Sequence, residues 1–328
     1  MNRPIRFAQI EPVGQCNLRC RMCPIQFRPD GAPGDPLAFM AFETFVAIID
    51  QLPALERLHL QGLGEPLMHP RFFDMVRYAA ARGVSVTTNT NLTLLSVRRS
   101  RLAVESGLAE LHASLDGASA QTYERIRVRA RFTRAKRHLE ELLKIRIESG
   151  REVPRVRLVM VVMRDNLHEL PDMVALARGV GVDSLFVQHL CHEYGEESLP
   201  ERYRPMRAFV EEQTLLNEDP ARVAHYFAVA RERATALGVD LRLPRTQAAG
   251  QSRGRCTWPW DGPYISYDGT AMPCCMIGTP DRVNFGSMAQ HGVDAVWKGD
   301  AYEAFRGALA SDTPPDVCRS CALYRGVF

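Results

Sequence analysis

Three cysteines near the start of the chain have the spacing of a metal-binding loop. Cys16, Cys20 and Cys23 follow directly on a strand-forming run at 7–11. Three thiolates in one short loop can ligate three irons of an iron-sulfur cluster, which leaves the fourth iron open to bind a small molecule. The alternative is a zinc site of four cysteines, or of three cysteines and a histidine, although zinc sites usually pair their cysteines as C-x2-C.

A second set of cysteines lies near the end of the chain. It consists of Cys256, Cys274, Cys318 and Cys321. Four thiolates can fully ligate one 4Fe-4S cluster and leave no iron open. A zinc ribbon is the alternative, because the set contains a C-x2-C pair. Cys275, beside this set, and Cys191, which stands alone, are either small buried residues or hydrogen-atom donors near a reaction site.

The elements that must position these cysteines alternate between strands and helices. Strand-forming runs occupy 7–11, 58–61, 84–88, 110–114, 157–163 and 184–188, and amphipathic stretches occupy 41–52, 70–81, 95–106, 118–126, 131–148 and 166–180. This order indicates βαβ units and a parallel sheet. Six such strands are too few for an eight-stranded barrel, so we expect an α/β fold with a partial (β/α)6 TIM-like barrel and reacting groups at the C-terminal strand ends.

The composition changes near residue 246. Helices are expected at 201–216 and 220–237, a further strand at 239–243, and a small-residue linker at 246–255. Beyond it, an Asp268-Gly269 turn between 264–267 and 270–274 predicts a hairpin. We therefore expect a barrel domain over 1–245 and a small domain over 246–328.

The Cys-x3-Cys-x2-Cys pattern resembles the signature of the radical S-adenosyl-L-methionine (SAM) superfamily. The resemblance implies that the open iron of a 4Fe-4S cluster chelates SAM, and that reductive cleavage of SAM yields a 5'-deoxyadenosyl radical. The residue before the third cysteine is commonly aromatic in that family and packs on the adenine. Here it is Met22, which is apolar and polarizable.

Three further motifs resemble the same family and follow predicted strands in its order. Gly62-Leu63-Gly64-Glu65-Pro66 is similar to the motif that receives the SAM amino group. Thr88-Asn89-Thr90-Asn91 departs from the common T-N-G, because Thr90 replaces the glycine. The third motif is Ala113-Ser114-Leu115-Asp116-Gly117, followed by Thr122-Tyr123-Glu124-Arg125-Ile126-Arg127. The resemblance implies cofactor contacts from Met22, Gly62, Gly64, Glu65, Asn89, Ser114 and Asp116.

The C-terminal cysteines resemble the SPASM/twitch extension of radical SAM enzymes. Cys256 and Cys274 form C-x17-C with an internal Gly269-x4-Cys274, and Cys318-x2-Cys321 follows. The resemblance implies one auxiliary 4Fe-4S cluster, and therefore two 4Fe-4S clusters and SAM as the cofactors. The spacing is similar to that of twitch-containing dehydrogenases that oxidise a secondary alcohol of an aminocyclitol.

An auxiliary cluster beside a radical site can accept the electron left on a substrate radical. This favours a two-electron oxidation of a small sugar or aminocyclitol, with an external reductant such as flavodoxin or ferredoxin. A base must take the hydroxyl proton, and His189 and Arg242 are the candidates. The alternatives are a radical epimerase with Cys275 or Cys191 as hydrogen donor, a radical SAM peptide maturase, and a non-enzymatic electron carrier or zinc-stapled scaffold.

Composition excludes other classes of protein. Apolar residues make up 46% and charged residues 24%, with a net charge of +3. No basic run suggests a nucleic-acid partner. No apolar run approaches the roughly 20 residues of a membrane span. The N-terminus has no signal-peptide pattern, so we expect a cytoplasmic protein.

Overall fold

The sheet at the centre of the molecule is built from strands spread along the whole chain. The structure is a computed structural model that describes residues 4–29, 38–190, 194–246 and 256–326. The sheet has nine strands in the order β7-β6-β5-β4-β3-β2-β1-β8-β9. Its strands are β1 (Phe7–Ile10), β2 (Arg57–Leu60), β3 (Ser85–Thr90), β4 (Glu110–Ser114), β5 (Arg155–Val162), β6 (Ser184–His189), β7 (Asp240–Arg242), β8 (Tyr264–Ile265) and β9 (Ala271–Met272).

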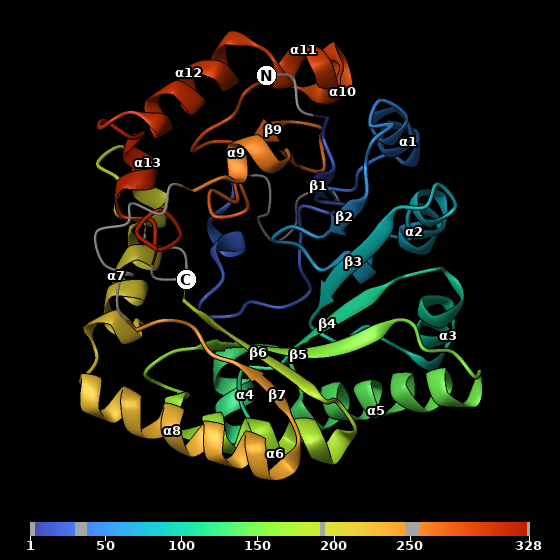
Figure 1. Cartoon of the computed structure of the whole chain (residues 1–328), viewed down its shortest axis with the longest axis vertical. Helices are drawn as coiled ribbons and strands as arrows, with labels where there is room; N and C mark the ends of the chain where they lie inside the picture. Colours follow the sequence, from blue (N-terminus) through green and yellow to red (C-terminus); the bar gives the residue numbers. More distant parts are fainter. Residues whose placement is uncertain (1–3, 30–37, 191–193, 247–255, 327–328) are drawn as a thin grey trace.

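The sheet is parallel from β7 to β8 and does not close into a barrel. Its two ends, β7 and β9, are not paired with each other, so the predicted partial barrel is confirmed (Figure 1). The C-terminal hairpin extends the sheet beyond β1: Gln9 N donates to Pro263 O at 2.9 Å and Glu11 N donates to Ile265 O at 2.8 Å. The second group of cysteines is thereby attached to the strand that leads into the first.

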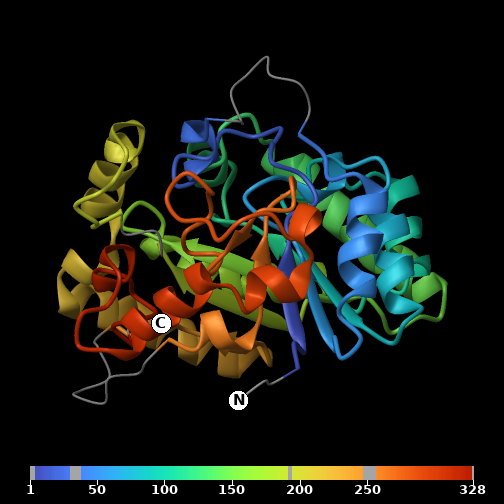
Figure 2. The ribbon, with the colours of Figure 1, turned by 90° about the horizontal axis from the view of Figure 1, so that it is seen from above.

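Helices cover the outer face of the curved sheet. Figures 1 and 2 show the C-terminal helices α12 and α13 across the molecule from α2 and α3. The helices are α1 (Phe42–Asp50), α2 (Phe72–Ala80), α3 (Val97–Glu105), α4 (Ala120–Ile126), α5 (Phe132–Glu148), α6 (Leu170–Val180), α7 (Arg204–Gln213), α8 (Pro220–Leu237), α9 (Trp258–Asp261), α10 (Met288–His291), α11 (Val293–Trp297), α12 (Asp300–Ala310) and α13 (Asp316–Arg319). None of the helices described is long and apolar enough to cross a membrane.

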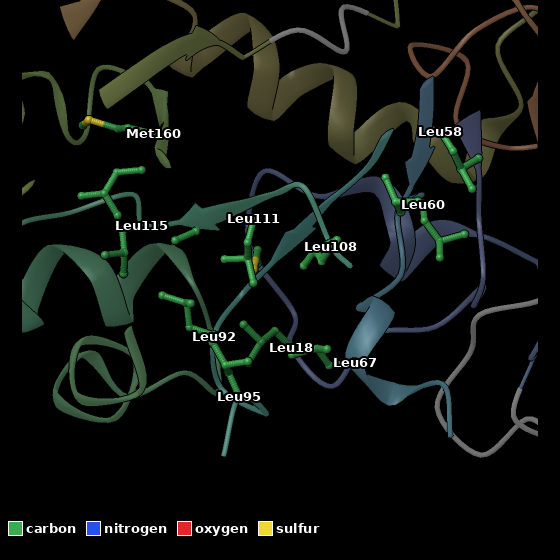
Figure 3. Close-up of a cluster of buried hydrophobic side chains, with 14 of the residues drawn as sticks. Leu18, Leu58, Leu60, Leu67, Leu92, Leu95, Leu108, Leu111, Leu115 and Met160 are labelled. Carbon is green, nitrogen blue, oxygen red and sulfur yellow. The ribbon is translucent and has the colours of Figure 1, made fainter. Parts of the chain in front are cut away.

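Burial alternates along β2, β3, β4 and β6, and this alternation separates the core from the site. In β2, Leu58 and Leu60 are buried, whereas His59 is partly exposed on the opposite face. The aliphatic face of the strands packs with residues such as Leu18, Leu67 and Leu111 in one buried cluster, part of which is shown in Figure 3. Because side chains alternate across a strand, the polar residues are left to face the inside of the curve.

Some boundaries differ from the predicted ones for local reasons. The predicted helix 166–180 begins with a 3-10 turn at Leu167–Glu169, and α6 starts only at Leu170, with a proline in its first turn. The predicted helix 201–216 is interrupted at Thr214, whose backbone is extended. The predicted hairpin forms only short strands, and β9 ends at Met272 because Pro273 has no N–H for a ladder.

Candidate functional site

The first three cysteines meet in a cavity at the C-terminal ends of the strands. Cys16, Cys20 and Cys23 all line it, and its space, including the part open to solvent, is about 880 Å³. The loop is held by backbone bonds to the segment after α4: Arg19 N donates to Val128 O at 3.1 Å, and Arg21 N donates to Ile126 O at 2.9 Å. The three sulfurs can therefore bind one shared ligand.

The environment of these thiols suits a polynuclear metal group. Burial raises the pKa of Cys16, Cys20 and Cys23 to about 12 each. Thiols at such positions become thiolates only when a cation compensates the charge, so cluster loading is coupled to proton release. Within the described ranges, no three His, Cys, Asp or Glu side chains are placed to hold a single metal ion.

The Gly62–Pro66 motif forms the next wall, and its glycines are required by packing. A Cβ on Gly64 would lie 2.0 Å from Val13 O and 2.6 Å from Gln15 O, in the loop that leads to the cysteines. Glu65 N donates to Gln15 O at 3.0 Å. The family resemblance implies that these glycines contact the cofactor. The structure adds that they let two loops of the site pack backbone to backbone.

Glu65 joins the loops after β2 and β3. Its carboxylate accepts from Thr90 Oγ1 at 2.7 Å, from Asn91 N at 2.8 Å and from Leu67 N at 3.3 Å. Burial raises the pKa of Glu65, while these hydrogen bonds oppose the rise. Thr90, which replaces the family's glycine, thus contributes a hydroxyl that orients the carboxylate. Glu65 lines the cavity and keeps acceptor capacity for a ligand ammonium.

Asp116 does not reach the cavity itself but contacts Arg127, a residue of its wall. Of the residues predicted to contact the cofactor, Met22, Asn89 and Ser114 line the cavity, whereas Asp116 does not. Its Oδ1 accepts from Val161 N at 2.8 Å, and its Oδ2 lies 2.7 Å from Nε of Arg127, which does line the cavity. Arg127 belongs to the third motif, but no cofactor contact was predicted for it. A cation and a carboxylate at one cavity, Arg127 and Glu65, match the carboxylate and ammonium of an amino acid group.

The four C-terminal cysteines also share one cavity. Cys256, Cys274, Cys318 and Cys321 line a space of about 530 Å³, including the part open to solvent, whose walls include Phe305 and Leu309. Burial, and then mutual repulsion, raises the pKa of Cys274 to about 12. The pKa of Cys256 rises to about 11 through burial, and that of Cys318 is raised for the same reason. Cys275 does not line this cavity, so the four thiols that the spacing selected are the ones brought together.

The predicted bases lie elsewhere. Gln188 on β6 and Leu190, directly after it, line the first cavity, whereas His189 points to the opposite face with its Nε2 against Arg245 O. Burial lowers the pKa of His189. Arg242 is exposed on the edge strand β7, with its guanidinium 5.1 Å from the Phe186 ring centre.

The predicted hydrogen donors do not meet the first cavity either. Cys275 is not among the residues that line it. Cys191 lies outside the described residues. The structure thus gives neither the proposed bases nor Cys275 a contact with the cavity.

Comparison with protein families identifies the class. The profile of the Radical SAM superfamily matches residues 10–177, and the chain belongs to this superfamily. The iron-sulfur cluster-binding domain SPASM matches residues 256–322. The superfamily implies a 4Fe-4S cluster and SAM, and the SPASM domain implies an auxiliary iron-sulfur cluster.

Several curated proteins are similar to nearly the whole chain. The tungsten-containing aldehyde ferredoxin oxidoreductase cofactor-modifying protein of Pyrococcus furiosus is 27% identical, over 97% of this chain and 88% of its own length. The PqqA peptide cyclase of Rhodopseudomonas palustris is 26% identical, over 96% and 78%. The AdoMet-dependent heme synthase of Methanosarcina barkeri is 26% identical, over 98% and 89%.

Solved structures share the fold at low identity. Streptococcus suis SuiB bound to S-adenosylmethionine is 14% identical and has a TM-score of 0.71, over 98% of this chain and 72% of SuiB. BtrN in complex with AdoMet and 2-DOIA is also 14% identical, with a TM-score of 0.51 over 98% and 94%. At these identities the likeness supports the fold alone.

Proposed function

We propose that this chain is a radical SAM oxidoreductase that removes two electrons from a C–H-bearing substrate. Cys16, Cys20 and Cys23 hold the SAM-binding 4Fe-4S cluster, and the four C-terminal cysteines hold the auxiliary cluster. When bound, the first cluster and SAM supply a 5'-deoxyadenosyl radical that takes a hydrogen atom from the substrate, and the auxiliary cluster accepts the electron that remains.

The chain's own residues orient SAM in this proposal. Arg127, fixed by Asp116, receives the SAM carboxylate through a charge-assisted hydrogen bond. Glu65 and the backbone of Gly62 and Gly64 face the ammonium. Met22 packs on the adenine, and the polar side chains of Asn89 and Ser114, which line the same cavity, face the ribose.

One observation carries the oxidative assignment. All four C-terminal thiols line a single cavity, so each iron of a cubane placed there has a protein ligand. A fully ligated cluster has no open site for a substrate, and its remaining role is to transfer electrons. A radical epimerase needs instead a hydrogen donor at the reaction site; Cys275 does not line the first cavity, and Cys191 lies outside the described residues. An electron carrier or zinc scaffold would give the charged side chains of Glu65 and Arg127 no ligand to bind.

The substrate has two candidates. The cysteine spacing supports the secondary alcohol of a small sugar or aminocyclitol. The similarity to a PqqA peptide cyclase over 96% of the chain supports a peptide instead. Both candidates lose two hydrogens in the proposed reaction: one as an atom to the deoxyadenosyl radical, and one as a proton whose electron goes to the auxiliary cluster.

The test is anaerobic reconstitution with iron, sulfide and SAM, followed by reduction with dithionite or with flavodoxin or ferredoxin. Deoxyadenosine formation is measured first. Aminocyclitols and synthetic peptides are then added in deuterated form. We expect deuterium in deoxyadenosine and a product that has lost one deuterium and one hydrogen. Deuterium transfer with recovery of an inverted product, in which one hydrogen has replaced the abstracted deuterium, would refute oxidation.

A further inference from the structure

Arg282 is the charged residue at the wall of the C-terminal cavity. Among the described residues that line this cavity, the others are cysteines, apolar side chains, Ser320 and two tyrosines. The Arg282 side chain is only 4% exposed, and its guanidinium lies 4.7 Å from the centre of the Tyr194 ring. A cation in so little water acts on a neighbouring charge more strongly than a surface arginine does.

The counter-ion of Arg282 comes from the barrel side of the molecule. Arg282 Nε donates to Glu196 Oε1 at 2.7 Å, and Glu196 is 2% exposed. Glu196 does not line the cavity. The pair is therefore oriented, with its positive end at the cavity and its negative end behind it.

The segment that carries Glu196 is fixed to the C-terminal region at two further points. Asp316 Oδ2 in α13 accepts from Glu197 N at 2.7 Å and from Ser198 N at 3.2 Å. A Cβ on Gly195 would lie 2.4 Å from Ser320 Oγ, between the last two cysteines. Contacts between the segment that carries Glu196 and the C-terminal region thus fix the orientation of the Arg282–Glu196 pair.

Arg282 also fixes the loop after Cys274. Its Nη1 donates to Ile277 O at 2.9 Å and to Met276 O at 3.4 Å. The backbone N–H groups of the same two residues bond to the Cys274 sulfur. Met276 O and the Ile277 N–H belong to one peptide group, so Arg282 holds one of the two groups that stabilise negative charge on a ligating thiolate.

We propose that Arg282 and Glu196 are positioning residues that set the reduction potential of the auxiliary cluster as an oriented charge pair. Nothing in the comparisons assigns a role to either residue, and the inference rests on the proposed ligation by the four cysteines. Reduction adds one electron to the cavity without forming or breaking a bond. The guanidinium at the wall stabilises that charge, and the carboxylate behind it limits the effect.

The test is an EPR-monitored redox titration of the full chain carrying Cys16→Ala, Cys20→Ala and Cys23→Ala, so that only the auxiliary cluster contributes. Arg282→Gln removes the positive end, and we expect a lower midpoint potential. At a fixed potential the reduced-to-oxidised ratio falls by about tenfold or more, which is about 59 mV for one electron. Glu196→Gln has nearly the same shape and removes the negative end, so the potential rises. Arg282→Lys keeps the charge and stays near the parent value.

Arg319→Gln is the matched control. Arg319 lies between Cys318 and Cys321, but its side chain is 59% exposed, so screening keeps its effect small. Shifts of Arg282→Gln and Glu196→Gln in the same direction, or no shift in either, would overturn the inference. Absence of about four irons from the parent triple variant contradicts the proposed ligation instead. Iron counting thus separates the two failures, and Glu196→Gln tests the inference even if Arg282→Gln does not fold.

Discussion

The two cysteine-lined cavities differ in what surrounds the sulfurs. The N-terminal cavity presents three thiols together with Glu65, Arg127 and several amides. The C-terminal cavity presents four thiols among mostly apolar side chains, with Arg282 as the charged residue among the described ones that line it. The first cavity thus offers both a cation and a carboxylate to a ligand, whereas the second offers a cation alone. One chain thus combines a site that binds a cosubstrate with a site suited to electron transfer.

Removal of the N-terminal thiols is the strongest test of this difference between the two cavities. With Cys16, Cys20 and Cys23 all changed to alanine, we expect complete loss of SAM cleavage, because no iron is left to bind SAM. The reconstituted variant should keep about four irons per chain. Iron analysis and deoxyadenosine measurement check both parts. Residual cleavage of SAM in this variant would contradict the assignment of the two sites.

Removal of the C-terminal thiols should give the opposite result. In Cys256→Ala/Cys318→Ala, we expect SAM cleavage to continue while the oxidised product is lost, because the substrate radical has no electron acceptor. The ratio of product to deoxyadenosine then falls far below that of the unmodified chain. Cys275→Ala is the matched control, since Cys275 lines neither cavity, and it should preserve the ratio.

Arg127 tests the charge of the first cavity. In Arg127→Met, the buried Asp116 carboxylate loses its partner, and breaking such a pair costs about 3–5 kcal/mol. We expect weaker SAM binding by calorimetry and a lower free energy of unfolding in urea. Arg125→Gln is the control, because Arg125 is 45% exposed. Equal SAM affinity for Arg127→Met and Arg125→Gln would argue against a carboxylate contact.

Gly64 tests the packing between the two loops of the first site. In Gly64→Ala, the new methyl meets Val13 O, and strain of this kind typically costs about 1–3 kcal/mol. We expect a lower unfolding midpoint and less iron after reconstitution. Gly179→Ala in α6 meets nothing within 4 Å and should raise stability by about 1 kcal/mol through helix propensity. Similar stability of the two variants would show that the loops can shift apart without cost.

Much of this arrangement could be predicted from local sequence. The cysteine spacings identified all seven thiols that line the two cavities, because ligands of one metal site often lie a few residues apart in the sequence. Turn and cap residues delimited α8 correctly: Asp219 caps its start, and Gly238, with φ of 65°, ends it. Alternation along β6 also predicts the position of His189, because His189 lies on the same face of the strand as the buried Leu185 and Val187.

The remaining features depend on contacts distant in sequence. Glu11 and Arg28 form an ion pair whose side chains are fully buried, and Glu11 Oε1 also accepts from Leu63 N at 3.0 Å. Neither residue belongs to a motif. Arg282 and Glu196 are 86 residues apart and meet only when the C-terminal hairpin joins β1. Periodicity describes a single element, so it cannot indicate which charges from two elements become partners.

The most direct test of one open and one closed cluster site is EPR of the reduced protein with and without SAM. We expect SAM to change the signal of one cluster only. In Cys256→Ala/Cys318→Ala the whole remaining signal should respond to SAM, and in the Cys16, Cys20 and Cys23 alanine variant the signal should stay unchanged. A response to SAM in the latter variant would contradict the account.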